Sequence, residues 1–200
     1  MSRSLRNLIL GLLIAAALIA GGLVWHHKAS PYHFLPVAPG VLYRSGTLRP
    51  GNLRKVIERH GIRTVVNLRT DAETQVGDWY RHESRIVGEL GAELVNLPLQ
   101  YETPPAKEQI EAWLALLDDE GRLPVLVHCQ HGVVRTGMLV AIYEMEYRRK
   151  GNRETLDTLP MFGHRLHQPH RKPMRDFILG YGSRWQQGEV MHPASGPSPP

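Results

Sequence analysis

The sequence predicts an α/β protein, with a mostly parallel sheet flanked by helices and one transmembrane helix before it. Short β-branched runs alternate with amphipathic stretches over residues 41–185, which is the pattern of strand–helix–strand units. An uncharged apolar run of 18 residues, Leu8–Trp25, precedes them. The content of 42% hydrophobic and 22% charged residues is that of a globular chain.

The first half of the alternation contains two predicted strands and two predicted helices. "GVLYRSG" and "IRTVVNLR" are short and rich in β-branched or aromatic residues, so each predicts a strand. Between them "NLRKVIERHG" predicts a helix that ends at Gly61. A second helix is predicted over residues 73–90. Apolar residues recur along these two helices: Leu53, Val56 and Ile57 in the first, and Val76, Tyr80, Val87 and Leu90 in the second.

The second half repeats the pattern and ends at the only cysteine. "AELVNLPL" and "LPVLVH" predict strands, and Thr103–Pro104 is a good opening for the helix between them. That helix places Ile110, Trp113, Leu114 and Leu117 on one face. A further helix is predicted from about Thr136 to Arg149, and another near residues 174–185. Ligands of parallel sheets bind beyond the carboxyl ends of the strands, which is where Cys129 lies.

The apolar run at residues 8–25 is interpreted as a membrane anchor. Eighteen helical residues cover about 27 Å, enough for a hydrocarbon core. A cleaved signal peptide is the alternative, since Ala20 and Gly22 are small, but the run exceeds the usual apolar length of such signals. Arg3 and Arg6 in the flank at residues 1–7 favour a cytoplasmic N-terminus. The expectation is therefore a single-pass membrane protein with its folded domain outside the cytoplasm.

The remaining segments divide by composition. Residues 26–40 contain three prolines and are expected to form a linker, residues 41–185 the folded domain, and residues 186–200 a disordered tail. The net charge of +5 favours an anionic partner. No nucleic-acid-binding motif accompanies that charge and only 7% of residues are aromatic, so nucleic acid is not the expected partner. A single cysteine excludes a disulfide within the chain.

The stretch "HCQHGVVRTG" predicts an anion-binding loop around a reactive thiol. A strand that leads through a tight loop into a helix presents unpaired backbone N–H groups, which bind a phosphate. Gly132 permits a backbone angle that other residues avoid, and Arg135 can offer two donors to the same anion. Helix N-termini and nearby cations also lower the pKa of a thiol. A buried, inert cysteine that ends a core strand is the alternative.

These residues resemble the His-Cys-x5-Arg-Ser/Thr loop of the protein tyrosine phosphatase superfamily, in the style of its dual-specificity and atypical members. "LYRSG", "GIRTVVNLR" and "LLDDEGRLPVLVHC" are similar to the same subgroup. The resemblance implies a cysteine phosphatase fold and hydrolysis of phosphate monoesters through a phosphocysteine intermediate. It implies that Cys129 is the nucleophile, Arg135 the transition-state ligand, Thr136 an aid to the second step and His128 a neighbour that tunes the thiol. The phosphate would be bound by Gln130, His131, Gly132, Val133, Val134 and Arg135.

The family also uses an Asp as general acid, and the region that should supply it, "PLQYETPP", has none. Glu102 is the acid nominated in its place, with Asp71 and Asp78 as weaker candidates. Arg69 is expected to form an ion pair with Asp71 or, less favoured, to bind substrate. Since the loop itself neutralises phosphate, no metal or other cofactor is expected.

The substrate is expected to be a phosphorylated protein or a small phosphate ester. The same resemblance implies a preference for phosphotyrosine, because family members that act on highly charged inositol phosphates tend to place lysines inside the loop, where this chain has Val133 and Val134. An inositol phosphate or phosphoinositide phosphatase, a rhodanese-like sulfurtransferase and a non-catalytic phospho-ligand binding module remain alternatives. The basic stretch 163–175 is interpreted as a solvated connector, or else as a rim that attracts anions; its three histidines make a poor metal site.

Overall fold

The computed structural model describes residues 7, 9, 11–16, 30–186 and 188, and it divides into two units, 1–31 and 32–200. In the first unit, residues 7, 9 and 11–16 are helical, with exposed apolar side chains such as Leu12 and Leu13. Within the described residues, no helix is both long and apolar enough to cross a membrane. This finding contradicts the predicted transmembrane helix at residues 8–25, and with it the predicted membrane location. Most of that stretch, and residues 189–200 of the expected tail, lie outside the described residues.

The second unit is built on a five-stranded sheet of order β1-β2-β5-β3-β4. The four strands β2 to β5 are mutually parallel and β1 runs antiparallel at the edge, which confirms the mostly parallel sheet. β5 lies at the centre, between β2 and β3. The strands are β1 (Leu35–Ala38), β2 (Leu42–Ser45), β3 (Thr64–Asn67), β4 (Glu93–Asn96) and β5 (Val125–His128).

One face of the sheet is covered by α2 (Pro50–His60) and α4 (Trp79–Glu89). Side chains alternate across a strand, so Val65 of β3 and Leu126 of β5 both turn to this face. They pack with Leu53, Val56, Ile57, Ile86 and Val87 from the two helices. α2 ends where predicted, with Gly61 in the left-handed region at φ 59°.

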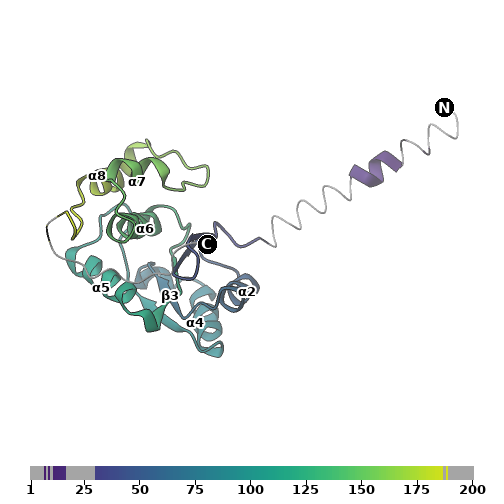
Figure 1. Cartoon of the computed structure of the whole chain (residues 1–200). Helices are drawn as coiled ribbons and strands as arrows, with labels where there is room; N and C mark the ends of the chain where they lie inside the picture. The colour runs from purple at the N-terminus through teal and green to yellow at the C-terminus, as the bar shows by residue number, and fades with distance from the viewer. Residues whose placement is uncertain (1–6, 8, 10, 17–29, 187, 189–200) are drawn as a thin grey trace. The chain divides into compact units, whose positions relative to one another are not determined.

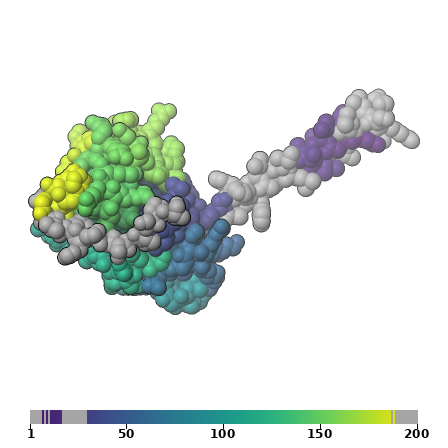
Figure 2. All heavy atoms as spheres, in the orientation of Figure 1, coloured from purple at the N-terminus to yellow at the C-terminus, as the bar shows by residue number. Residues whose placement is uncertain are grey.

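The opposite face is covered by the helices of the second half of the chain. In Figure 1 α6 (Val134–Glu146) lies across this face, with α5 (Lys107–Asp118) beside it and α7 (Asn152–Thr158) and α8 (Lys172–Gly180) beyond it. Every residue of α6 is buried, including its polar ones. Figure 2 shows the green to yellow residues that follow β5 gathered on one side of the second unit, with the blue residues around α2 on the other.

Three elements differ from the pattern expected of the sequence. The helix predicted over 73–90 is two helices, α3 (Asp71–Thr74) and α4, because Gly77 adopts φ 73° between them. The helix expected to open at Thr103–Pro104 begins at Lys107. Residues 35–38, placed in the expected linker, form β1. The 3-10 turns η1 (Glu120–Arg122) and η2 (Pro169–Arg171) complete the unit.

Candidate active site

Cys129 follows the central strand β5 directly, at the edge where the parallel strands end. Its side chain belongs to the core cluster beneath α6 and the residue is 3% exposed. Because β2, β3 and β4 run parallel to β5, the segments that leave these strands all start at the same edge. The fold thus gathers segments from four strands around one sulfur.

Two carbonyls of the loop are held by Thr47, which follows β2. The hydroxyl of Thr47 donates to the Cys129 carbonyl at 3.2 Å. The backbone N–H of Thr47 donates to the Gln130 carbonyl at 3.1 Å. Thr47 therefore fixes the outward direction of the first two peptide groups.

The next two carbonyls are also held from outside. Nδ1 of His33 donates to the His131 carbonyl at 2.8 Å, and Nη2 of Arg44 donates to the Gly132 carbonyl at 2.6 Å. Four successive carbonyls of the loop are thus bonded to groups that do not belong to it.

This arrangement determines where the loop's N–H groups point. A trans peptide is planar, with its N–H opposite its C=O, so each outward carbonyl directs the following N–H inward. The Gly132 N–H accordingly donates to Sγ of Cys129 at 3.2 Å. The helix α6 then begins at Val134, which brings the positive end of its dipole to the loop. The loop is a cradle of donors for an anion.

Gly132 is required by this geometry. Its φ is 67°, and a Cβ added there would lie 2.3 Å from the Ser45 carbonyl oxygen and 2.5 Å from the Gly46 nitrogen. Both of those are backbone atoms and cannot move aside independently. The loop can therefore close over β2 only with glycine at this position.

The hydrogen-bond donors around Sγ of Cys129 favour its deprotonated form. Burial alone would disfavour the thiolate, but Thr136, Arg135 and the Gly132 N–H stabilise it, and together they lower the pKa of Cys129. The Thr136 hydroxyl is completely buried and, within the described part of the chain, makes no hydrogen bond of normal geometry, which leaves it available to the sulfur. The thiol therefore has the electrostatic environment of a nucleophile.

His128 lies beneath the loop and is paired with an acid that the sequence did not indicate. Nε2 of His128 lies 2.9 Å from Oε1 of Glu83, a residue of α4, and both side chains are at most 5% exposed. Burial opposes the charged imidazole, but Glu83 and then Cys129 raise the pKa of His128 above its ordinary value. A cationic His128 next to the sulfur further favours the thiolate.

Arg135 is hydrogen-bonded to Glu73, a second acid that the sequence analysis did not identify. Nη1 donates to Oε2 of Glu73 at 2.6 Å and Nη2 to Oε1 at 3.0 Å, so the contact is bidentate. Nη1 also lies 3.3 Å from the carbonyl oxygen of Leu99, beyond β4. The Arg135 hydrogen bond is the main cause that lowers the pKa of Glu73 to about 2. Glu73 thus remains ionised and fixes the plane of the guanidinium.

Arg69 does not form the expected pair with Asp71. Its Nε lies 3.4 Å from Glu73, and its guanidinium stacks 3.8 Å above the ring of Trp79. Nη1 of Arg69 also donates to the Thr47 hydroxyl at 3.3 Å. Arg69 therefore supports Thr47, which holds the loop carbonyls, and Glu73, which holds Arg135.

The candidate general acids lie outside these contacts. Glu102 has φ 61° in the connection between β4 and α5, the connection whose Leu99 accepts from Arg135. Asp71 is exposed at the start of α3, and Asp78 is exposed and bonded to Arg81. Asp71 and Asp78 belong to the connection after β3, which also touches Arg135, through Leu68 and Glu73. Contact with Arg135 therefore does not single out one of the three, and the role of Glu102 stays a prediction.

A rim of aromatic rings and imidazoles borders the loop on the side of His131. The Tyr32 hydroxyl lies 3.1 Å from Nδ1 of His131, and the ring of His33 stacks on Phe162 at 4.3 Å. His164, from the basic stretch 163–175, lies 6.1 Å from His33. Its Nδ1 is held at 3.1 Å by the buried Arg171. In the described part of the chain no three metal-binding side chains converge on a possible ion site.

Comparison with known proteins agrees with this geometry. Residues 41–172 match the family model described as DSP-PTPase phosphatase fused to NAD+ kinase. A probable chloroplastic NAD kinase 2 of Oryza sativa subsp. japonica is 32% identical over 92 residues, 44% of this chain and 9% of that protein. NAD kinase 2 of Arabidopsis thaliana is 28% identical over 56% of this chain and 11% of its own length. The chain thus spans about a tenth of the length of these curated relatives.

Solved phosphatase structures share the fold. The core catalytic domain of the PP-IP phosphatase SIW14 from S. cerevisiae superposes with a TM-score of 0.62 at 20% identity, covering 76% of this chain and 86% of that one. P. aeruginosa TpbA gives a TM-score of 0.60 at 21% identity over the same shares. At this identity the likeness shows the fold. It is the family match over residues 41–172 that places the chain: it belongs to the DSP-PTPase phosphatase family of cysteine phosphatases known from fusions to NAD+ kinase.

Proposed function

We propose that the protein hydrolyses phosphotyrosine, and with it phosphoserine or phosphothreonine, through a phosphocysteine formed on Cys129. The observation that carries this proposal is the loop itself. Four outward carbonyls turn the intervening N–H groups inward, and one of those N–H groups already meets Sγ at 3.2 Å. A phosphate bound there has the nucleophile beneath it and needs no metal to neutralise its charge.

In the first step the thiolate attacks phosphorus, the S–P bond forms and the P–O bond to the leaving group breaks. The leaving oxygen takes a proton from a general acid, for which Glu102 is the proposed residue. Arg135, held in plane by Glu73, binds two oxygens of the transferring group. Gln130, His131, Gly132, Val133 and Val134 contribute their backbone N–H groups.

In the second step water attacks the phosphocysteine, the carboxylate left by the general acid takes a proton from that water, and the S–P bond breaks. The thiolate returns, and inorganic phosphate leaves. The buried Thr136 hydroxyl can donate to the departing sulfur, and the His128–Glu83 pair keeps positive charge beside it. Both effects lower the barrier to departure because they stabilise the anionic sulfur.

Two observations favour phosphotyrosine. The loop carries apolar Val133 and Val134, both buried, where a polyanionic ligand would favour cations. The related fold of P. aeruginosa TpbA has been solved in complex with pTyr.

A second candidate is a small ester that carries more than one phosphate. The rim formed by His33, His131 and His164 borders the loop with imidazole groups, and these can bind a further anionic group. SIW14, which shares the fold, is named as a PP-IP phosphatase. The Val133–Val134 pair weighs against this candidate, and a substrate comparison decides between the two.

The test uses the full chain with p-nitrophenyl phosphate, a phosphotyrosine peptide, a phosphoserine peptide and an inositol pyrophosphate. Cys129→Ser is expected to abolish turnover but keep phosphopeptide binding, and Arg135→Ala to lose both. Arg63→Ala, which removes an exposed arginine, is the matched control and should behave as wild type.

Turnover by Cys129→Ser at the wild-type rate would exclude the covalent mechanism. Binding without turnover by the intact protein would indicate a phospho-ligand binding module. Sulfur transfer from thiosulfate in place of phosphate release would indicate a rhodanese-like enzyme.

A further inference from the structure

Arg44 is a fully buried arginine in the strand next to the Cys129 loop. In the parallel β2–β5 pair, Arg44 lies opposite Val127. Residues two apart on a strand share a face, so Arg44 points to the same side of the sheet as Val127 and Cys129. That side is the core beneath α6, and Arg44 is 0% exposed there.

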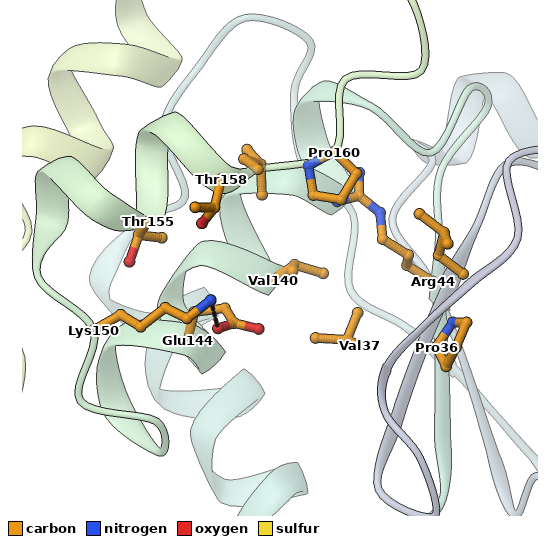
Figure 3. Close-up of a pocket in the computed structure, with 11 residues that line it drawn as sticks. Pro36, Val37, Arg44, Val140, Glu144, Lys150, Thr155, Thr158 and Pro160 are labelled. Carbon is orange, nitrogen blue, oxygen red and sulfur yellow. Dashed lines mark ion pairs between the residues drawn. The ribbon is translucent and has the colours of Figure 1, made fainter.

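No carboxylate compensates this charge among the described residues. The adjoining cavity, about 120 Å³ in volume, is lined by a single acid, Glu144, and Glu144 binds Lys150 at 2.7 Å. Figure 3 shows that pair on one side of the cavity and the Arg44 side chain on the other, extending toward Pro160. Nε and Nη1 of Arg44 are buried without a hydrogen-bond partner in the described part of the protein.

The contacts that Arg44 does make lead to the loop. Nη2 donates to the Gly132 carbonyl at 2.6 Å, and the guanidinium lies 5.2 Å from the ring centre of Phe162. By holding the Gly132 carbonyl outward, Arg44 turns the following N–H into the cradle.

A buried cation without a counter-charge is costly, and the structure offers one anion to balance it. Burial lowers the pKa of Arg44 to about 10, and the charge of Cys129 acts in the opposite direction. Arg44 and the thiolate are thus mutually stabilising across the loop.

We propose that Arg44 is the buried counter-charge of the Cys129 thiolate and the residue that positions the Gly132 peptide. This inference rests on the proposed function, because it assigns Arg44 a task in making the nucleophile. Arg44 does not need to touch the substrate; it acts through the sulfur's charge and through the loop. Its contribution adds to those of the other charged groups around the thiol, which are the pairs His128–Glu83 and Arg135–Glu73, and Arg69 beside Glu73.

The experiment measures the rate of Cys129 alkylation by iodoacetamide against pH, on the full-length protein without substrate. Arg44→Met should raise the thiol pKa by at least about one unit, a tenfold loss of thiolate at a pH below both values. Arg44→Lys keeps the positive charge but loses the planar guanidinium that holds the Gly132 carbonyl. The pKa of its Cys129 thiol should therefore stay nearer the wild-type value, while kcat falls because the Gly132 peptide is less well positioned. Arg184→Met, the loss of a partly buried arginine that pairs with Asp118 and Glu146, is the control and should leave the thiol pKa unchanged.

The outcomes separate this inference from the proposed function. A low thiol pKa in the wild type that Arg44→Met leaves unchanged would overturn the role of Arg44 alone. An ordinary thiol pKa in the wild type, without turnover, would overturn the proposed function. Circular dichroism checks that each variant folds. If Arg44→Met does not fold, Arg44→Lys decides, because a folded Arg44→Lys protein with an ordinary thiol pKa contradicts the counter-charge.

Discussion

The carboxylate of Glu73 and the guanidinium of Arg135 meet in two parallel hydrogen bonds of 2.6 and 3.0 Å. Arg135 is almost fully buried while Glu73 remains partly exposed, so the acid reaches inward from α3 to the arginine. Two bonds fix both the position and the plane of the guanidinium. Under the proposed function, Glu73 prepares Arg135 to receive the oxygens of a phosphate.

Glu73→Gln should reduce kcat/KM about 10- to 100-fold on p-nitrophenyl phosphate, because a displaced Arg135 fits the transition state less well. Glutamine can still cap the helix α3 through Thr70, so the variant isolates the contact with Arg135. Steady-state kinetics check this expectation. Ala72→Gly, at an exposed position of the same helix, is the control, and an equal loss there would assign the effect to α3 in general.

The same pair should make stability depend on acid. Because the Arg135 contact lowers the pKa of Glu73 from 4.5 to about 2, the ionised carboxylate contributes stability that is complete above about pH 4.5. That contribution is lost as the pH falls from 4.5 toward 2. Urea unfolding of wild type and Glu73→Gln should therefore differ at pH 6 and converge near pH 2. A difference that stays constant across this range would contradict the assignment.

The sequence could predict those site residues that lie close together in the chain better than those that come from distant segments. Cys129, Gly132, Arg135 and Thr136 lie within eight residues, so the strand–loop–helix order and the family resemblance together were enough to predict their roles. Glu73 left one readable signal, the Thr70-x-x-Glu73 capping box that opens α3. The capping box does not indicate that the Glu73 carboxylate also binds Arg135, which lies 62 residues later in the chain.

The remaining partners required the three-dimensional arrangement. Glu83 lies on an ordinary amphipathic helix, and only the packing of α4 under β5 brings it to His128. Tyr32 and His33 come from a segment that its prolines marked as linker, although proline is compatible with an edge strand such as β1. Sequence patterns identified the four parallel strands and most helices because burial imposes those patterns, whereas the edge strand β1 was missed. Such patterns do not indicate which side chains of different loops contact one another.

Glu83→Gln should destabilise the protein by about 3–5 kcal/mol, since it leaves a buried His128 without its counter-charge. Because Glu83 raises the pKa of His128 above 6.5, the charged pair contributes stability that is complete below about pH 6.5 and is lost as the pH rises through the higher folded value. The difference between wild type and variant should thus shrink at alkaline pH. Chemical denaturation at pH 6 and pH 10 measures this difference in unfolding free energy. An equal difference at both pH values would show that the destabilisation comes from altered packing and not from the lost charge pair.

Gly132→Ala should destabilise the fold by about 3 kcal/mol or more, because the added Cβ would meet the Ser45 backbone and occupy an unfavourable φ. A folded remainder should also lose phosphate binding, since the Gly132 N–H can no longer face the sulfur. Gly51→Ala in α2 is the control. Nothing lies within 4 Å of its added Cβ, and alanine favours the helix, so it should be neutral or slightly stabilising.

Glu102→Gln tests the general acid through the leaving group. An alkyl phosphate leaves as a poor alkoxide and needs a proton, so its kcat should fall about 10²- to 10⁴-fold. The kcat for p-nitrophenyl phosphate should fall much less, because nitrophenolate departs without one. The connection that carries Glu102 touches Arg135 through the Leu99 carbonyl, so an effect confined to KM would indicate that the variant disturbs binding and does not remove an acid. Equal, small losses on both substrates would contradict the role of Glu102, and Asp71→Asn and Asp78→Asn, measured in parallel, would then identify the acid by the same dependence on the leaving group.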